Sequence, residues 1–311
     1  GAEKIMRAEA AFAQGRFTDA HIELESAYAR IEGNGQENMA LCCDFLAWRL
    51  SLCTDVEMRY SFEQRREQLL RQHNAAWLNI LDAASAYYHA LLGKTERIPE
   101  VFSAHRLSSI SILAPGKPMA EMIENQVLLA QGAYAKVIGR SEGQLAVCEA
   151  MHYALVALHV RLQTAAAYEA LGKHDEACRL LGKALDDAAP DGIIIPFVEN
   201  YSYIESALHD CSVQPELVGS IVQLGEAISA RKKAAPSAES RPAEFAALTD
   251  REYEIAALTL RRLSNREIAE KLFLSEGSVK QYMKQIYSKL GIQGDTRTKR
   301  KQLSELMQQN F

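Results

Sequence analysis

The sequence is poor in the residues that build turn-rich or disulfide-stapled folds. Its 311 residues include only 17 glycines and 8 prolines, which argues against a β-rich chain with many tight turns. The six cysteines form no C-x-x-C pair, and no cysteine or histidine cluster has the spacing of zinc ligands. We therefore expect a helical chain with reduced thiols, located in the cytoplasm, that holds no metal or other cofactor.

Signals for membrane insertion and for catalysis are also missing. The most apolar long stretch, residues 74–93, contains Asp82 and His89, which predicts a packed helix rather than a membrane span. The chain opens directly into an amphipathic pattern, without a signal peptide or initiator Met, which suggests a piece of a longer protein. No H-E-x-x-H or G-x-S-x-G motif occurs, and we predict no enzymatic activity. Residues 92–95 resemble the end of a P-loop, but Tyr88 replaces the required glycine, which argues against nucleotide binding.

Charge is divided unequally along the chain. The net charge is −5, yet residues 245–311 hold 12 basic and 8 acidic residues, which leaves 23 basic and 32 acidic residues in the remainder. Residues 231–244 lack apolar periodicity and contain two prolines and two serines, a composition typical of linkers. The sequence therefore predicts an acidic domain over 1–230, a linker over 231–244 and a basic domain over 245–311.

A short segment recurs in the first domain with a period of about 40 residues. Its glycines are separated by 78, 39 and 40 residues, and an apolar residue follows each glycine by five positions. One skipped copy falls near Thr54, and a sixth copy is predicted near Ser212. The glycines are Gly15, Gly93, Gly132 and Gly172.

Each period is interpreted as a helical hairpin. The glycine supplies the left-handed backbone that ends the first helix, and each hairpin leaves an apolar face that the next one covers. The segments resemble tetratricopeptide repeats, whose period of ~34 residues is shorter. We expect an all-α, tetratricopeptide-like curved solenoid, with an all-helical domain lacking regular stacking as the alternative.

The last domain has the spacing of a small helix-turn-helix bundle. The expected helices cover residues 250–261, 265–272, 276–290 and 297–309, and only three residues join the second and third. Helix starts are predicted by two capping boxes, Thr249–Glu252 and Ser264–Glu267, and by Ser275, with Asp295 or Thr296 before the fourth helix and Gly291 as the stop of the third.

One face of the third helix is apolar and the opposite face is polar. A spacing of 4, 3 and 4 residues places the apolar side chains on one buried stripe. The polar face can enter a major groove, where lysine meets phosphate or guanine and glutamine pairs with adenine. Residues 279–301 add seven basic residues against one acid. The apolar stripe is Val279, Met283, Ile286 and Leu290, and the opposite face is Gly277, Gln281, Lys284 and Ser288.

The motifs of this domain resemble the signature of LuxR/FixJ-type helix-turn-helix regulators. The matching runs are Leu248–Glu252, Leu263–Ala269, Leu274–Lys280 and Lys289–Gly291. The resemblance implies contact with double-stranded DNA by Lys280, Gln281 and Lys284, and phosphate anchoring by Ser264, Asn265 and Ser275. Ser288 and Arg297 complete the predicted DNA-binding set. Two positions depart from the family pattern: Arg262 replaces a glycine, and Tyr282 replaces a histidine.

A helical repeat array followed by this domain resembles the C-terminal portion of MalT-like regulators. That resemblance implies an ATPase module upstream, absent here, and repeats that sense a small molecule or a protein partner. We therefore expect a transcription regulator that binds promoter DNA as a homodimer, with Leu303 and Leu306 of the fourth helix as either dimer contacts or core residues. The alternative is a non-enzymatic adaptor whose basic domain docks an acidic protein or RNA.

Overall fold

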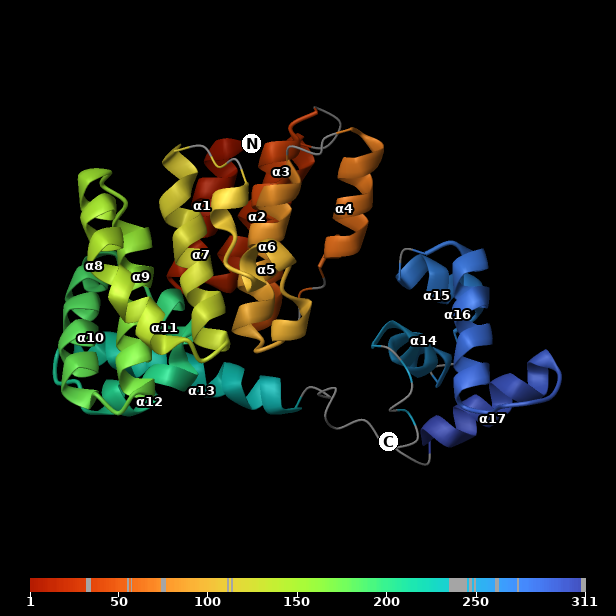
Figure 1. The fold of residues 1–311 in the computed structure, drawn as a ribbon. Helices are drawn as coiled ribbons and strands as arrows, with labels where there is room; N and C mark the ends of the chain where they lie inside the picture. Colours follow the sequence, from red (N-terminus) through yellow and green to blue (C-terminus); the bar gives the residue numbers. More distant parts are fainter. Residues whose placement is uncertain are drawn as a thin grey trace. The chain divides into compact units, whose positions relative to one another are not determined.

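A computed structural model describes residues 1–31, 35–54, 56, 58–73, 77–110, 112, 114–234, 245, 248, 250–260, 263–272 and 274–308. Within these ranges every regular element is a helix and there is no strand, which confirms the predicted all-α class. The chain divides into two compact units, Gly1–Ala230 and Arg231–Phe311, called here the N-terminal and C-terminal units (Figure 1). In the same ranges, no helix combines the length and the apolar character needed to cross a membrane.

The N-terminal unit consists of α-helices joined by short turns and single 3₁₀ turns. Its first elements are α1 (Ala2–Ala13), α2 (Phe17–Ile31), α3 (Glu37–Cys53), α4 (Phe62–Arg71), α5 (Leu78–Leu91), η2 (Thr95–Arg97), α6 (Glu100–Ser103), η3 (Leu107–Ser109) and η4 (Ala114–Gly116). They are followed by α7 (Lys117–Ala130), α8 (Tyr134–Ala150), α9 (Ala154–Ala170), α10 (His174–Ala188), η5 (Ala189–Asp191), α11 (Ile195–Glu199), α12 (Tyr201–His209) and α13 (Pro215–Ala234).

Three helical hairpins, α1–α2, α7–α8 and α9–α10, form at predicted repeat positions. The glycine between the two helices has a φ of +74°, +72° or +71°, in the left-handed region that favours glycine. The apolar residue five positions later is fully buried, which lets the second helix pack closely on the first. The glycines are Gly15, Gly132 and Gly172, and the buried residues are Ala20, Val137 and Ala177.

The copy at Gly93 does not continue as the sequence predicts. Gly93 has a φ of +69° and ends α5 as expected. In place of a full second helix, however, only a 3₁₀ turn and the four-residue α6 follow. Pro99 explains the difference, because a proline disfavours helical backbone at the residue before it, and Ile98 is extended with φ −72° and ψ 128°. The predicted hairpin is therefore wrong at this copy.

The two copies that lack the glycine lie at breaks between helices. Thr54 is extended (φ −136°, ψ 171°) and ends α3. The next helix begins after Ser61, whose hydroxyl and backbone N–H form a reciprocal capping box with Gln64. Ser212 lies between α12 and α13, where Gln214 takes the positive φ of 51°.

The two ends of the N-terminal unit are in contact, which an open solenoid does not predict. The Ile194 N–H donates to the Ala13 carbonyl at 2.8 Å, and the Gln14 side chain donates to the Asp191 carbonyl at 2.9 Å. Gly15 permits this approach, because a Cβ there would lie 2.7 Å from the Ile194 side chain. In an open solenoid each repeat contacts only its neighbours, whereas here the first hairpin packs on α11 and shares one core with α13.

The predicted linker begins later than the sequence suggests. Helix α13 continues to Ala234, so residues 231–234, the first four of the predicted linker, belong to a helix. This stretch contains alanine, arginine and lysine, which favour helix, and the first proline is at position 236. Residues 235–244 lie outside the described ranges.

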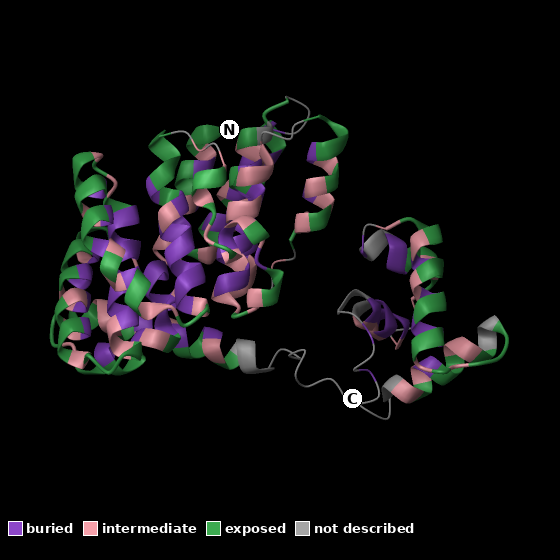
Figure 2. Cartoon of the chain, in the orientation of Figure 1, coloured by how far each residue is buried: buried purple, intermediate pink, exposed green. Residues whose placement is uncertain are grey.

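In the described part of the C-terminal unit, four helices lie within one residue of their predicted bounds. They are α14 (Asp250–Leu260), α15 (Asn265–Lys271), α16 (Glu276–Lys289) and α17 (Thr296–Gln308). Helix α14 packs on α16 and α17, and α15 packs on α16. Buried residues line the facing sides of these helices, while the outer side of α16 is largely exposed (Figure 2).

Candidate nucleic-acid interface

Side-chain caps fix the start of both helices that form the helix-turn-helix. The Ser264 hydroxyl accepts from the Glu267 N–H at 3.2 Å, and the Glu267 carboxylate accepts from the Ser264 N–H at 2.6 Å. These bonds lower the pKa of the Glu267 carboxyl. The Ser275 hydroxyl accepts from the Ser278 N–H at 3.0 Å and caps α16. The predicted capping box and the Ser275 cap are confirmed, and the helices they start define the interface.

The other predicted caps have mixed outcomes. Asp295 caps α17, because its carboxylate accepts from the Thr298 N–H at 2.8 Å. Thr249 lies outside the described residues, so its capping box stays a prediction. Glu252 is buried and forms an ion pair with Lys289 at 2.6 Å, which ties α14 to the end of α16.

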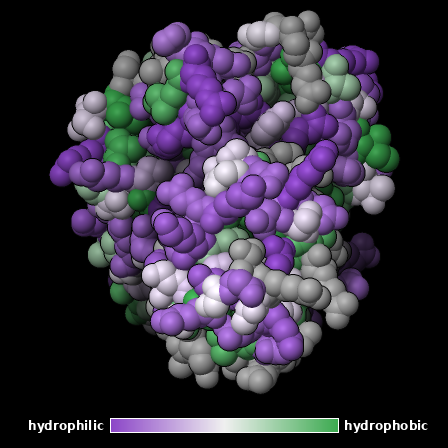
Figure 3. All heavy atoms as spheres, turned by 90° about the vertical axis from the view of Figure 1, so that its right-hand side faces the viewer, coloured by the Kyte–Doolittle hydropathy of each residue, from purple (hydrophilic) through white to green (hydrophobic). Residues whose placement is uncertain are grey.

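Helix α16 has the two faces that its sequence predicts. Val279, Met283 and Ile286 are 0–4% exposed and pack in the unit's core, whereas Leu290 is half-buried at the end of the stripe. The opposite face is exposed along the whole helix. Its candidate DNA-binding side chains are Lys280, Gln281, Lys284 and Ser288, and all four are exposed. Figure 3, which faces the side of α16 and α17, shows mainly hydrophilic side chains with isolated hydrophobic ones.

Lys280 already has a partner on its own helix. Its ammonium lies 2.8 Å from the Glu276 carboxylate in an exposed i,i+4 ion pair, and it lowers the pKa of that carboxyl. An exposed pair of this kind contributes little stability and breaks readily. Lys284 forms no ion pair with any described residue. Of the two lysines, Lys284 is therefore the one whose ammonium group is not held by a carboxylate among the described residues.

Asn265 is held in place by Arg300 of α17. The Asn265 carbonyl oxygen accepts from the Arg300 guanidinium at 2.8 Å, and the same guanidinium also donates to the Leu263 carbonyl. This contact uses the carbonyl oxygen of Asn265 and not its amide N–H₂ group, and the neighbouring Ser264 is exposed. The Arg297 side chain lies outside the described residues, so its role stays a prediction.

Sequence reasoning missed two of these partners. The Glu276–Lys280 spacing of four residues on a helix signals an ion pair. The Arg300–Asn265 contact joins residues that are 35 positions apart, and no local sequence pattern predicts it.

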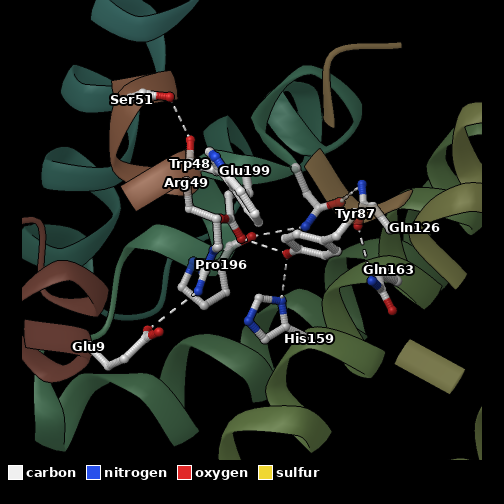
Figure 4. Close-up of polar contacts among 11 residues, drawn as sticks. Glu9, Trp48, Arg49, Ser51, Tyr87, Gln126, His159, Gln163, Pro196 and Glu199 are labelled. Carbon is white, nitrogen blue, oxygen red and sulfur yellow. Dashed lines mark hydrogen bonds and ion pairs between the residues drawn. The ribbon is translucent and has the colours of Figure 1, made fainter. Parts of the chain in front are cut away.

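A second polar group, called here the Arg49 cluster, lies inside the N-terminal unit and is buried except at Glu9, which is partly exposed (Figure 4). The Arg49 guanidinium donates to Glu199 at 2.8 Å and lies 3.5 Å from Glu9. The Tyr87 hydroxyl donates to the other Glu199 oxygen at 2.7 Å and lies 3.4 Å from His159. The cluster therefore joins α1, α3, α5 and α9 to α11, across the contact between the unit's two ends.

Burial and charge oppose each other in the Arg49 cluster. The guanidinium of Arg49 holds the pKa of Glu199 below its ordinary value, although burial acts in the opposite direction. Burial raises the pKa of Glu9 and lowers the pKa of His159 to about 4. Among the residues the structure describes, no three His, Cys, Asp or Glu side chains are placed to hold a metal ion. The cluster thus holds these helices together through charged contacts.

Comparison with known proteins gives a match at the C-terminal unit. Residues 246–300 match the family described as bacterial regulatory proteins, luxR family. A segment of 56 residues is 45% identical to the transcriptional regulatory protein LnrK of Bacillus subtilis (strain 168). This segment covers 18% of the present chain and 26% of LnrK. No solved structure matches the chain significantly.

Proposed function

Because residues 246–300 form a domain of the luxR family of bacterial regulatory proteins, we propose that the protein is a transcription regulator that binds promoter DNA through α16. The observation that carries this proposal is the exposed polar face of α16, held on a buried apolar stripe and preceded by the capped α15. A helix of this kind, joined by a short turn to the helix before it, is the recognition element of helix-turn-helix proteins.

Different side chains serve different parts of the DNA in this proposal. Lys284 neutralises a phosphate or contacts a guanine edge. Lys280 does the same once its ion pair with Glu276 has broken. Gln281 reads a base, because a neutral amide gains little from a phosphate and pairs well with adenine. Ser264, Asn265 and the Ser275 cap bind the backbone and set the register.

The regulator acts on DNA as a homodimer in this proposal, because one recognition helix reads few bases. Leu303 is fully buried in its own unit's core, and Leu306 is partly buried against that core. Dimer contact and core packing were the two roles predicted for these leucines, and the burial of Leu303 favours core packing. Exposed polar residues of α17 remain for a dimer contact.

The N-terminal unit senses a small molecule or a protein partner, in the cytoplasm, where its six unpaired cysteines stay reduced. Its acidic charge makes it a poor ligand for DNA, so the two units divide sensing from binding. No catalytic step is assigned to either unit.

A selection of bound genomic DNA, followed by gel shifts at several salt concentrations, tests the proposal. Sequence-specific enrichment, with affinity falling as salt rises, is the expected result. If the chain enriches no DNA sequence but binds RNA or an acidic protein, the adaptor alternative is correct and the proposal is wrong.

A further inference from the structure

A pocket, called here the α7 pocket, lies along one face of α7 in the N-terminal unit. Its volume is about 410 Å³, within the range of about 300–1,000 Å³ that small-molecule sites occupy. Arg140 of α8 and the segment before α7 supply the rest of its lining. The residues from α7 share one helical face, and they are Lys117, Ala120, Glu121 and Glu124.

The Glu124 carboxylate is buried beside this pocket with one oxygen unsatisfied. Its side chain is only 7% exposed, and its Oε2 atom accepts from Arg140. Its Oε1 atom lies 3.5 Å from Nδ1 of His105, and that nitrogen has no hydrogen-bond partner. Among the described residues, none donates a hydrogen bond to Oε1. An acceptor that is buried without a donor costs free energy, so a hydrogen bond from a ligand to Oε1 is favoured.

Glu121 adds a second carboxylate one turn earlier on α7. Its side chain is 26% exposed and lies 4.0 Å from the Lys117 ammonium, whose side chain is 70% exposed. An ion pair of this length between partly exposed groups contributes little stability. Glu121 and Glu124 therefore provide acceptors for an ammonium group, and Lys117 can turn to an anionic group at little cost.

The remaining lining of the α7 pocket is aliphatic except for the exposed Ser108. Leu107, Ile110 and Ile112 are half-buried, and Ala120 is buried. These side chains favour contact with an apolar group. The charged part of the described lining holds two acids and two bases, so a ligand with one charge of each sign leaves this balance unchanged.

We propose that the α7 pocket binds a free α-amino acid with an aliphatic side chain. Its ammonium group lies between Glu121 and Glu124, its carboxylate lies at Lys117, and its side chain contacts the aliphatic lining. The assignment goes beyond the proposed function by naming a ligand class, and it rests on that function only in treating the amino acid as the regulator's signal.

The test uses the full chain with isotope-labelled Ile and Leu methyl groups, observed by NMR. The probe is L-leucine, and the methyl signals of Leu107, Ile110 and Ile112 are expected to shift. Isopentylamine lacks the carboxylate of leucine, and isocaproate lacks its ammonium group. Each is expected to bind about tenfold more weakly, because one charge-assisted contact is lost. Glycine should also bind at least about tenfold more weakly, because it has no side chain to bury.

Two variants locate the charged contacts. Lys117→Gln should weaken leucine binding about fivefold and leave isopentylamine binding unchanged, whereas Glu121→Gln should weaken the binding of both. Glu124 is left unchanged, because its pair with Arg140 is largely buried. Lys136→Gln and Glu142→Gln, exposed changes on α8 outside the pocket, serve as matched controls and should bind leucine like the parent.

Three results overturn the assignment. The methyl signals of the pocket do not move with leucine, or one of the two analogues binds as tightly as leucine, or both variants bind leucine like the parent. The assay contains no DNA, so loss of amino-acid binding and loss of DNA binding are separate outcomes.

Discussion

Separating Arg49 from Glu199 should destabilise the N-terminal unit far more than an ordinary ion-pair loss. Their side chains are only 11% and 5% exposed, so removal of either partner leaves a buried charge without compensation. Breaking such a pair from one side costs about 3–5 kcal/mol. Arg49→Met leaves the Glu9 and Glu199 carboxylates facing each other, and Glu199→Leu also removes the acceptor of the Tyr87 hydroxyl.

The double variant Arg49→Met/Glu199→Leu should be more stable than the sum of the two losses indicates. Both charges are then gone, and replacement of a buried pair by apolar side chains is often neutral. A coupling energy of about 3 kcal/mol is therefore expected from the cycle. Arg7→Met breaks the exposed Arg7–Glu3 pair on α1 and serves as the matched control, with an expected loss below about 0.5 kcal/mol.

Urea unfolding at pH 7, followed by tryptophan fluorescence, measures these free energies. Both tryptophans of the chain, Trp48 and Trp77, lie in the N-terminal unit, so the signal does not mix the two units. If the two single losses add within about 0.5 kcal/mol, the sites act independently. In that case Arg49 and Glu199 do not form one buried unit.

Three further predictions concern acid stability, the repeat turns and DNA binding. The pKa of His159 is lowered from 6.5 to about 4, so the full stability is present above pH 6.5, and about 3 kcal/mol is lost progressively as pH falls from 6.5 through 4. His159→Gln should remove that part of the pH dependence in urea titrations, and an unchanged profile contradicts it. Gly172→Val should lower the unfolding free energy by about 1–2 kcal/mol because φ is +71°, whereas Gly139→Ala, in open space within α8, should raise it by about 1 kcal/mol; equal effects of both on urea midpoints would disprove the backbone argument. Lys284→Ala should reduce the log–log salt slope of DNA binding by about one, while Gln281→Ala should keep the slope and cost ~1–3 kcal/mol on specific DNA alone; isotherms in which both bind like the parent exclude α16 as the reading element.

The C-terminal unit could be predicted almost completely because its signals are local. Ser264, Ser275 and Asp295 each reach a backbone N–H three residues ahead, and this spacing is written in the sequence. The alternation of Val279 and Met283 with Gln281 and other polar residues likewise reports which side of α16 is buried. Local interactions were therefore enough to predict three helix starts and the exposed face of α16.

The closed form of the N-terminal unit could not be predicted in the same way. In the sequence, Gly15 looks like one more repeat glycine. In the structure it also lets Ile194 approach the backbone of the first hairpin. The Arg49–Glu199 pair joins residues 150 positions apart. Contacts of this range depend on how all the intermediate helices stack, and Pro99 shows that one residue can change a hairpin within an otherwise regular series.

The contact between α1 and α11 has a consequence for synthesis of the chain. The ribosome releases the first hairpin long before residues 191–228 exist, and these residues supply the part of its apolar cover that α3 does not. Until then the part of its apolar face that packs on α11 and α13 has no native partner, so the nascent chain passes through a stage with exposed apolar surface that chaperones recognise. Joining distant segments also slows folding. The N-terminal unit therefore completes its core only when nearly the whole unit has been translated. A series of independent repeats would instead fold one hairpin at a time.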